Sequence, residues 1–554
     1  MSSLMRITIG DLLDKRAADR PDHEAVVYPH RNLRWTYAQF QKLCNQVALG
    51  LMALGIQKGD HVAIWATNYP EWLITQFATA KIGAVMVTVN TNYKEFELEY
   101  LLRQSDATTL ILIDGFKDSN YIEHIYTLCP ELKSAEPGNL KSSKFPYLKN
   151  IIYIGDKENP GMYNWNELYR LGSKIPVAEL EKRRKSLNVH DVINMQYTSG
   201  TTGFPKGVML THYNITNNGN AIADSMKLTY RDRLCIPVPF FHCFGCVLGI
   251  MACISKGATI VSLDYFHPVR VMEAIEREKC TGIHGVPTIF ISMLEHPDFN
   301  SFDFSSLRTG IMAGSPCPVK VMERVVNDMG AKEITIAYGQ TESSPVITQT
   351  RTNDPIDLRV STVGKALPNV EVKIIDVESG RDADVLQQGE IVTRGYHVMK
   401  GYYKMPEATT QVTDKDGWLH TGDLGVMDES GYLRITGRLR DMIIRGGENI
   451  YPREIEEFLY THQAVKDVQV VGVPDKKYGE EVMAFIILKE EEVCSENEII
   501  EFVKNGLSRY KAPRYVHFLD NYPMTASGKI QKYKLREMAI ELLQLEDEAS
   551  IETA

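Results

Sequence analysis

The most informative stretch of this sequence gathers the groups that bind a triphosphate. Residues 197–208 read YTSGTTGFPKGV, so hydroxyls, three glycines and one lysine stand within twelve positions. Glycines let backbone N–H groups approach an anion, hydroxyls add donors, and a lysine compensates negative charge. A flexible hairpin turn is the simpler alternative, but a polar turn seldom needs five hydroxyls. We therefore predict a phosphate-binding loop formed by Thr198, Ser199, Gly200, Thr201, Thr202, Gly203 and Lys206.

This loop differs from the P-loop of kinases and NTPases. That motif needs glycine directly before the lysine and serine or threonine directly after it, at the start of a helix. Here Pro205 precedes Lys206, Gly207 follows it, and residues 208–210 (VML) predict a strand. A phosphotransferase that uses the same loop and releases ADP stays open as an alternative.

Three clusters further along the chain could complete a nucleotide site. In residues 337–342 (AYGQTE), an aromatic ring beside glycine can stack on a purine, and Thr341 can donate to a phosphate. Glu342 can hold magnesium, a hard cation that prefers oxygen ligands. Asp423, which ends the stretch GWLHTGD, can accept both hydrogen bonds of a ribose diol. Near the C-terminus, Lys529 follows a glycine, which allows a tight loop that projects its ammonium group.

Together these motifs resemble, in the same order along most of the chain, the signatures of the adenylate-forming superfamily. That superfamily contains acyl-CoA synthetases, luciferases and peptide-synthetase adenylation domains. The resemblance implies that a carboxylic acid displaces pyrophosphate from Mg·ATP to give an acyl-adenylate, and that the thiol of coenzyme A then takes the acyl group. Residues 89–93 (VNTNY) and the loop around His242 are most similar to medium-chain fatty acyl-CoA synthetases. The cofactors implied are ATP, Mg²⁺ and the co-substrate coenzyme A.

The resemblance also implies a role for each motif residue. Lys529 reaches the substrate carboxylate and the α-phosphate, where a fixed cation stabilises the charge of the transition state. Glu342 holds the metal, and Arg438 assists Asp423 at the ribose. The predicted catalytic residues are Lys529, Thr341, Glu342 and His242. Beyond the loop, the predicted ATP ligands are Gly314, Ser315, Tyr338, Gly339, Thr341, Asp423, Arg438 and Lys529. The predicted acyl pocket is lined by His242, Gly245, Cys246, Val286 and Gly339.

The resemblance further implies a C-terminal domain that rotates between the two half-reactions. One arrangement cannot easily hold the lysine over the adenylate and also open a thiol tunnel. Arg440 corresponds to the hinge, which need only absorb a large backbone change. Gly446 and Gly447, in the stretch IIRGGENI, resemble the segment that lines the path of the pantetheine arm. Arg445 beside them is expected to attract the phosphates of coenzyme A.

The elements expected to position these residues follow an α/β pattern. Strands are expected at 61–65, 84–89 and 110–113, with a helix from about Glu71, which implies parallel sheets covered by helices. Residues 114–185 are rich in Pro, Gly, Lys and Asn and predict loops. A further helix that Gly55 ends is predicted by apolar residues recurring at three- and four-residue steps: Tyr37, Phe40, Cys44, Val47, Leu51 and Leu54.

We expect two domains. Residues 1–439 form an N-terminal AMP-binding domain of parallel α/β sheets, with a β-rich subdomain at about 350–439. Residues 440–554 form a small, mobile α+β domain with a helix from Pro452 to Leu459 and strands at 468–473 and 483–488. Ser495 and Glu498 have the spacing of a capping box and predict the start of the next helix.

Composition limits the other classes of function. The 554 residues are 44% hydrophobic and 24% charged, typical of a soluble protein, and the net charge of −10 argues against nucleic-acid binding. The N-terminus lacks the apolar stretch of a signal peptide, and the run 244–254 is too short to span a membrane and predicts a buried helix. Nine scattered cysteines favour a reducing, cytoplasmic location. The pair Cys243 and Cys246 lacks the second ligand pair of a zinc site.

Several alternatives stay open within and beyond the superfamily. An aryl-acid CoA ligase, an adenylation enzyme for a carrier protein and a luciferase-like oxygenase would share the motifs. No carrier segment with a modifiable serine is evident, and the glycine pair favours coenzyme A. Apolar residues at 242–247, with small side chains at Gly245 and Cys246, favour a medium straight-chain acid. A binding protein that kept the fold and lost activity is disfavoured, because every expected polar position is filled. The sequence indicates no oligomeric state.

Overall fold

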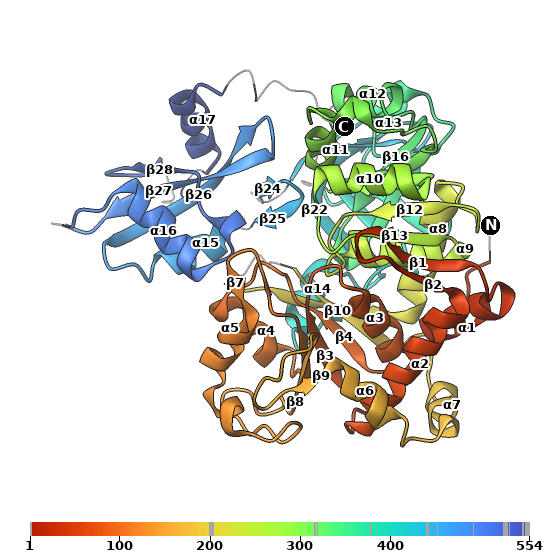
Figure 1. The fold of residues 1–554 in the computed structure, drawn as a ribbon. Helices are drawn as coiled ribbons and strands as arrows, with labels where there is room; N and C mark the ends of the chain where they lie inside the picture. Colours follow the sequence, from red (N-terminus) through yellow and green to blue (C-terminus); the bar gives the residue numbers. More distant parts are fainter. Residues whose placement is uncertain are drawn as a thin grey trace.

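Two mainly parallel sheets form the large domain (Figure 1). The structure is a computed structural model, and it describes residues 3–198, 204–314, 317, 319–376, 379–438, 443–450, 452–490, 492–523, 530, 532–545 and 548. One sheet has eight strands in the order β21-β11-β10-β4-β3-β5-β8-β9, of which β10, β4, β3, β5, β8 and β9 are parallel. Its strands are β3 (His61–Trp65), β4 (Val85–Thr88), β5 (Thr109–Leu112), β8 (Asn150–Tyr153), β9 (Tyr163–Asn164), β10 (Val192–Thr198), β11 (Lys206–Thr211) and β21 (Gly401–Tyr402).

The second sheet of the large domain has nine strands in the order β18-β17-β16-β15-β14-β12-β13-β1-β2. Its six inner strands, from β16 to β1, are parallel, and its edges are antiparallel. The strands are β1 (Glu24–Tyr28), β2 (Leu33–Thr36), β12 (Arg233–Ile236), β13 (Thr259–Ser262), β14 (Gly282–Gly285), β15 (Thr309–Met312), β16 (Glu333–Gly339), β17 (Val346–Gln349) and β18 (Lys365–Ala366).

Helices cover the faces of both sheets, as the α/β pattern predicts. The predicted helix after Thr36 is confirmed: Thr36 and Gln39 form a capping box, and Gly55 follows its last turn with φ +85°. The predicted buried helix near 244–254 is also confirmed, as a π-helix (Phe244–Met251) that continues into α9. The helices of the large domain are α1 (Ile9–Asp19), α2 (Tyr37–Ala53), α3 (Pro70–Ile82), α4 (Glu95–Gln104), α5 (Tyr121–Leu128), α6 (Trp165–Gly172), α7 (Val177–Lys185), α8 (His212–Ser225), α9 (Ala252–Lys256), α10 (Pro268–Glu278), α11 (Pro287–Leu294), α12 (Val319–Asn327), α13 (Ile356–Ser361) and α14 (Pro406–Val412).

The prediction of loops throughout residues 114–185 is wrong. This segment contains β8, which lies fully buried beside β5, as well as α5, α6 and α7. The helices are short, and in α6 and α7 polar residues dominate the sequence even though each has a buried side. In α6, for example, Trp165 and Leu168 are buried and the residues between them are not.

The region from residue 350 to 438 contributes to three sheets, and its strand β21 belongs to the eight-stranded sheet described above. The predicted β-rich part is an antiparallel four-stranded sheet in the order β19-β20-β22-β23. Strand β18, in contrast, completes the edge of the nine-stranded sheet. The strands of the smaller sheet are β19 (Val370–Ile375), β20 (Gly389–Gly395), β22 (Leu419–Met427) and β23 (Leu433–Arg438).

The small C-terminal domain, drawn in blue, stands to one side of the large one (Figure 1). It has its own apolar cores on the two faces of one sheet, and the predicted capping box at Ser495 is confirmed. Its elements are β24 (Ile443–Arg445), β25 (Glu448–Ile450), α15 (Pro452–Leu459), β26 (Val465–Asp475), β27 (Gly479–Leu488), α16 (Glu496–Gly506), β28 (Tyr515–Phe518) and α17 (Lys532–Leu543). The structure thus confirms an α/β fold with a large N-terminal and a small C-terminal domain. Across the described parts of the chain, no helix is both long and apolar enough to cross a bilayer.

Close packing within the nine-stranded sheet leads to a first prediction. Gly310, in β15, has φ +149°, and a Cβ atom there would lie 1.8 Å from the carbonyl oxygen of Ile283 in β14. We expect Gly310→Ala to destabilise the large domain by about 3 kcal/mol, because overpacking adds to backbone strain. Thermal denaturation followed by circular dichroism measures this loss.

The matched control is Gly330→Ala. Gly330 also has a positive φ, +73°, but a Cβ atom there would meet nothing within 4 Å. It should therefore lower the midpoint of denaturation less than Gly310→Ala does. Equal midpoints for the two variants would contradict this account of β15.

Candidate active site

The predicted site residues gather where parallel strands end. Strands β12, β14, β15 and β16 are neighbours that run in one direction, so their carboxyl ends share one edge of the sheet. Ligands bind at this edge in open α/β sheets. The segments that follow these strands carry three of the predicted positions, in chain order His242, Val286 and Gly314, and a fourth, Tyr338, is the next-to-last residue of β16.

The phosphate loop joins two strands of the other sheet. Thr198 ends β10 and Lys206 begins β11, and the two residues face each other across this antiparallel pair. Lys206 is almost fully buried, with its Nζ 4.8 Å from the centre of the Tyr402 ring. The loop residues Ser199, Gly200, Thr201, Thr202 and Gly203 lie outside the described residues, so their role stays a prediction.

Helix α4 holds both ends of this loop, which the sequence did not reveal. The hydroxyl of Tyr100 donates to the carbonyl oxygen of Pro205 at 3.0 Å, and its ring stacks on Phe204 with centroids 4.8 Å apart. At the other end, the hydroxyl of Tyr197 donates to Gln104. The one signal of this contact in the sequence is the presence of aromatic residues in α4. Their spacing does not identify a partner that lies a hundred positions away in the chain.

The carboxylate of Glu342 lies beside Thr198, where the phosphate loop begins. Its Oε1 accepts hydrogen bonds from the hydroxyl of Tyr402 at 2.8 Å and from Thr198 at 3.4 Å. Burial raises the pKa of Glu342, and the Tyr402 hydrogen bond and the charge of Lys206 act in the opposite direction. Tyr402 was missed in the sequence because its strand, β21, is only two residues long and gains its position by pairing with β11. The site thus holds one carboxylate and one ammonium group beside the loop.

The aromatic and the aspartate expected at the nucleoside meet directly. The hydroxyl of Tyr338, at the end of β16, donates to Oδ2 of Asp423 in β22 at 2.8 Å. Asp423 is largely buried, and its backbone lies opposite Arg438 across β22 and β23. An aromatic face and a carboxylate from two different sheets therefore lie within one hydrogen bond of each other.

The backbone beside Tyr338 is built for close packing. A Cβ atom on Gly339 would lie 1.8 Å from the carbonyl oxygen of Pro345, so only glycine fits. Thr341 is buried and begins a short 3₁₀ helix (Thr341–Ser343). The hydroxyl of Ser343 accepts the backbone N–H of Gln340, the residue before this helix. This turn brings Glu342 back over the loop.

The expected acyl wall is tightly packed around a neutral histidine. Burial lowers the pKa of His242 to about 4, and its Nδ1 accepts the backbone N–H of Phe244 at 3.1 Å. Gly245 was expected to leave room for an alkyl chain, but a Cβ atom there would lie 2.3 Å from the carbonyl oxygen of Pro239. Its small size is therefore explained by packing within its own loop. The thiol of Cys246 accepts a hydrogen bond from Gln196 at 3.0 Å, so this residue too is engaged.

The glycine pair of the small domain reaches this edge of the large domain. In Figure 1, β24 and β25 extend from the small domain toward the large one. Gly446 and Gly447 form the turn between them, with φ +58° and +85°. A Cβ atom on Gly447 would lie 2.7 Å from Val286, and one on Gly314 would lie 3.9 Å from the Cα of Gly447. The turn thus contacts two predicted walls of the site.

Arg445, expected to attract the phosphates of coenzyme A, is engaged within the small domain. Its Nε lies 2.8 Å from the buried carboxylate of Glu481, and its Nη1 donates to the carbonyl oxygen of Tyr510 at 2.7 Å. Its charge is already compensated in this orientation, which favours a structural role. Ser315, the hinge Arg440 and the catalytic candidate Lys529 lie outside the described residues, and these three assignments stay predictions.

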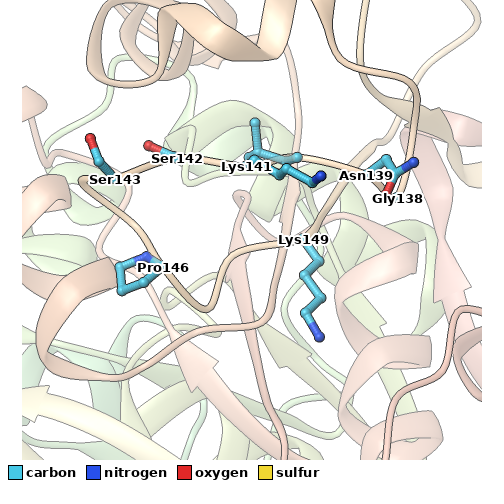
Figure 2. Close-up of a pocket in the computed structure, with 8 residues that line it drawn as sticks. Gly138, Asn139, Lys141, Ser142, Ser143, Pro146 and Lys149 are labelled. Carbon is cyan, nitrogen blue, oxygen red and sulfur yellow. The ribbon is translucent and has the colours of Figure 1, made fainter.

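An open cavity on the large domain contains none of the predicted residues. It has a volume of about 480 Å³ and lies in the segment before β8, and Figure 2 shows the residues that line it. It presents polar side chains such as Lys141, Ser142 and Lys149. No catalytic constellation of the kind described above lines it.

Comparisons with known proteins cover almost the whole chain. Residues 13–403 match the family model described as AMP-binding enzyme, and residues 454–529 match the AMP-binding enzyme C-terminal domain. YngI of Bacillus subtilis (strain 168), an acyl-CoA synthetase by name, is 61% identical over 98% of this chain and 99% of its own length. The mitochondrial medium-chain acyl-CoA ligase ACSF2 of Bos taurus is 42% identical over 97% of this chain and 88% of its own length.

Solved structures share the fold at lower identity. A double mutant of o-succinylbenzoate CoA synthetase (MenE) from Bacillus subtilis, bound with its product analogue OSB-NCoA, has a TM-score of 0.77 at 27% identity. The match covers 96% of this chain and 99% of that one. ATP-bound MatB from Rhodopseudomonas palustris has a TM-score of 0.67 at 27% identity, covering 97% of this chain and 100% of that one.

The pair of Tyr338 and Asp423 leads to a second prediction. Tyr338→Phe keeps the aromatic face but removes the hydroxyl that orients the Asp423 carboxylate. We expect nucleotide affinity to fall about fivefold, which corresponds to about 1 kcal/mol for one hydrogen bond. Isothermal titration with ATP measures the change.

Tyr432→Phe is the matched control, because the hydroxyl of Tyr432 donates at the same distance, 2.8 Å, to a different aspartate, Asp354. It should leave nucleotide affinity unchanged. An equal loss in both variants would mean that Asp423 is not the group that the nucleotide contacts.

Proposed function

Because this chain belongs to the AMP-binding enzyme family, we propose that its site joins a medium-chain carboxylic acid to coenzyme A through an acyl-adenylate. Its reaction class is that of the acyl-CoA synthetases: an acid is activated with ATP, and the acyl group passes to coenzyme A. One observation carries the proposal. Thr198, Lys206 and Glu342 meet beside the phosphate loop, and Tyr338 and Asp423, the pair that we propose for the nucleoside, meet in one hydrogen bond.

In the first half-reaction, a carboxylate oxygen of the acid attacks the α-phosphorus, and the bond to pyrophosphate breaks. The protein contributes position and charge rather than covalent chemistry. Lys206 and the loop from Thr198 bind the phosphates, and Asp423 binds the ribose diol. Lys529 supplies the cation that stabilises the charge developing between carboxylate and phosphate.

The residues present fit a magnesium ion at this site. Mg²⁺ is usually bound by one or two carboxylates together with substrate phosphates and water. Glu342 offers one buried carboxylate beside the phosphate loop. In the described portion of the chain, no group of three or more His, Cys, Asp or Glu side chains could form a cage for a metal. Glu342 would therefore hold the ion together with ATP, whose negative charge the ion neutralises.

In the second half-reaction, the thiolate of coenzyme A attacks the carbonyl carbon of the acyl-adenylate, and AMP leaves. We assign the observed orientation of the small domain to this step. The turn of Gly446 and Gly447 lies against Val286 and Gly314, where a backbone without side chains gives a thin arm access. The TM-score supports this assignment, since it is higher with the OSB-NCoA complex than with the ATP complex at equal identity.

The proposal also specifies which class of carboxylic acid is the substrate. Identity of 42% to a protein named as a medium-chain ligase supports a medium-chain acid. Aryl acids are the alternative, because an apolar wall around His242 would accept a ring as well. Transfer to a carrier protein instead of free coenzyme A is the second alternative, and the relatives named as an acyl-CoA synthetase and an acyl-CoA ligase argue against it. Nine free cysteines support the cytoplasmic location that we also propose.

Lys529→Ala tests the first half-reaction. We expect acid-dependent exchange of pyrophosphate into ATP to fall by about 10² to 10³, the usual cost of removing a preorganised transition-state contact. Lys504→Ala, at an exposed pair with Glu501 on α16, is the control and should retain wild-type exchange. Exchange that survives in Lys529→Ala would remove this lysine from the mechanism.

A panel of acids tests the substrate assignment. We expect octanoate and decanoate to exceed benzoate and coumarate in kcat/KM by at least about tenfold, because an apolar pocket discriminates by the surface that it buries. Pyrophosphate release and acyl-CoA formation are measured for each acid with free coenzyme A. Aryl acids ahead of the alkyl acids would establish the alternative.

A further inference from the structure

A buried lysine joins the two domains. Lys511, in the small domain, places its Nζ 2.6 Å from Oε1 of Glu97 in α4 and 2.7 Å from Oε1 of Glu454 in α15. Exposed fractions of 1% for Lys511 and 2% for Glu97 show that this contact between domains is closed to water. Ser508 of the small domain adds a hydrogen bond to Glu97 at 2.9 Å.

This contact favours one arrangement of the domains more than it stabilises either domain. Glu97 is already held in place within the large domain, since its Oε2 accepts the backbone N–H of Lys94 at 3.1 Å. Burial alone would lower the pKa of Lys511, but Glu454 and Glu97 raise it well above its usual value, so the lysine stays charged. In this orientation Lys511 is buried, and a buried charge that loses one of its two carboxylate partners is strongly destabilised. Lys511 can therefore be buried against the large domain only where Glu97 is within reach.

Neighbouring contacts surround the same point. The amide of Asn90 donates to the hydroxyl of Tyr510 at 3.3 Å, and the Phe96 and Phe458 rings have centroids 6.2 Å apart across the interface. Arg509 and Asp118 form an ion pair at 2.9 Å on the exposed rim. Rim pairs contribute little because water screens them. The buried contact of Lys511 with Glu97 is thus the polar centre of the interface.

The interface is tied to the glycine turn of the active site. Arg445, the residue before Gly446, donates to the carbonyl oxygen of Tyr510 at 2.7 Å, one residue before Lys511. When Lys511 engages Glu97, this bond fixes the base of the turn that contacts Val286. The domain contact and the turn therefore move as one unit.

We propose that Glu97 and Lys511 form a latch that selects the orientation of the small domain in which the glycine turn lines the site, so that both are positioning residues for acyl transfer to coenzyme A. The latch opens for adenylation, when Lys529 must occupy the site instead. This inference rests on the proposed function, and it adds two residues and a specific step to it.

The test measures the rates of the two half-reactions separately in the variant Glu97→Gln. Glutamine keeps the size, the capping position and an acceptor for Ser508, but it removes the charge that Lys511 needs. We expect the rate of acyl transfer from preformed octanoyl-adenylate to coenzyme A to fall at least about tenfold. Single-turnover pyrophosphate release without coenzyme A should stay within about twofold of wild type, a difference that a merely structural role would not produce.

Glu99→Gln is the matched control on the same helix. Glu99 is partly exposed and pairs with Lys144 and Arg103, both in the large domain. It should leave both half-reactions unchanged. A double-mutant cycle with Lys511→Met completes the test, because a latch predicts that the double variant transfers no more slowly than the slower single variant.

The outcomes separate the latch from the proposed function. Equal losses in both half-reactions, no loss in either, the same loss in Glu99→Gln, or additive losses in the cycle would each overturn the latch. These four results concern only the variants, so the wild-type protein would remain active and the proposed function would still hold. A wild-type protein that releases no pyrophosphate with any acid would overturn the proposed function and the latch together.

Discussion

The hydrogen bond from Tyr338 to Asp423 joins two sheets that have no strand in common. Tyr338 ends a parallel strand at the ligand-binding edge, and Asp423 lies in the antiparallel sheet that the chain adds later. This contact brings together the aromatic face and the carboxylate that we propose for the nucleoside. The rest of the site is arranged around it, because the turn that follows Tyr338 also returns Glu342 to the phosphate loop.

Residues in contiguous motifs could be predicted from the sequence, since their spacing and residue types carry the chemistry. The loop from Thr198, the stretch ending at Glu342, and Asp423 are of this kind. Residues such as Tyr402, Tyr100 and Lys511 could not, because each acts through a partner far away in the chain. Likewise, short amphipathic helices in 114–185 have too few buried positions for their period to emerge. Gly245 shows the reverse case, in which a small residue suggested a pocket but serves local packing.

The two domains contribute unequal numbers of groups to the proposed site. Nearly all described groups of the proposed nucleotide site belong to the large domain, and the small domain contributes a turn of two glycines in this orientation. A turn with positive φ at both positions can enter a narrow space that any side chain would fill. The small domain thus supplies a wall here, and we propose that its catalytic group, Lys529, acts in another orientation. Separate cores within the small domain allow it to keep its fold through such a change.

Helix α4 is only ten residues long, yet it contacts two separate parts of the proposed site. Tyr100 and Gln104, toward its C-terminal end, form hydrogen bonds with the ends of the phosphate loop. Glu97, one turn earlier, forms an ion pair with Lys511 of the other domain. A short helix behaves as a rigid rod, because its backbone hydrogen bonds resist bending. A displacement of α4 would therefore act on the residues that flank the phosphate loop and on the contact with the small domain together.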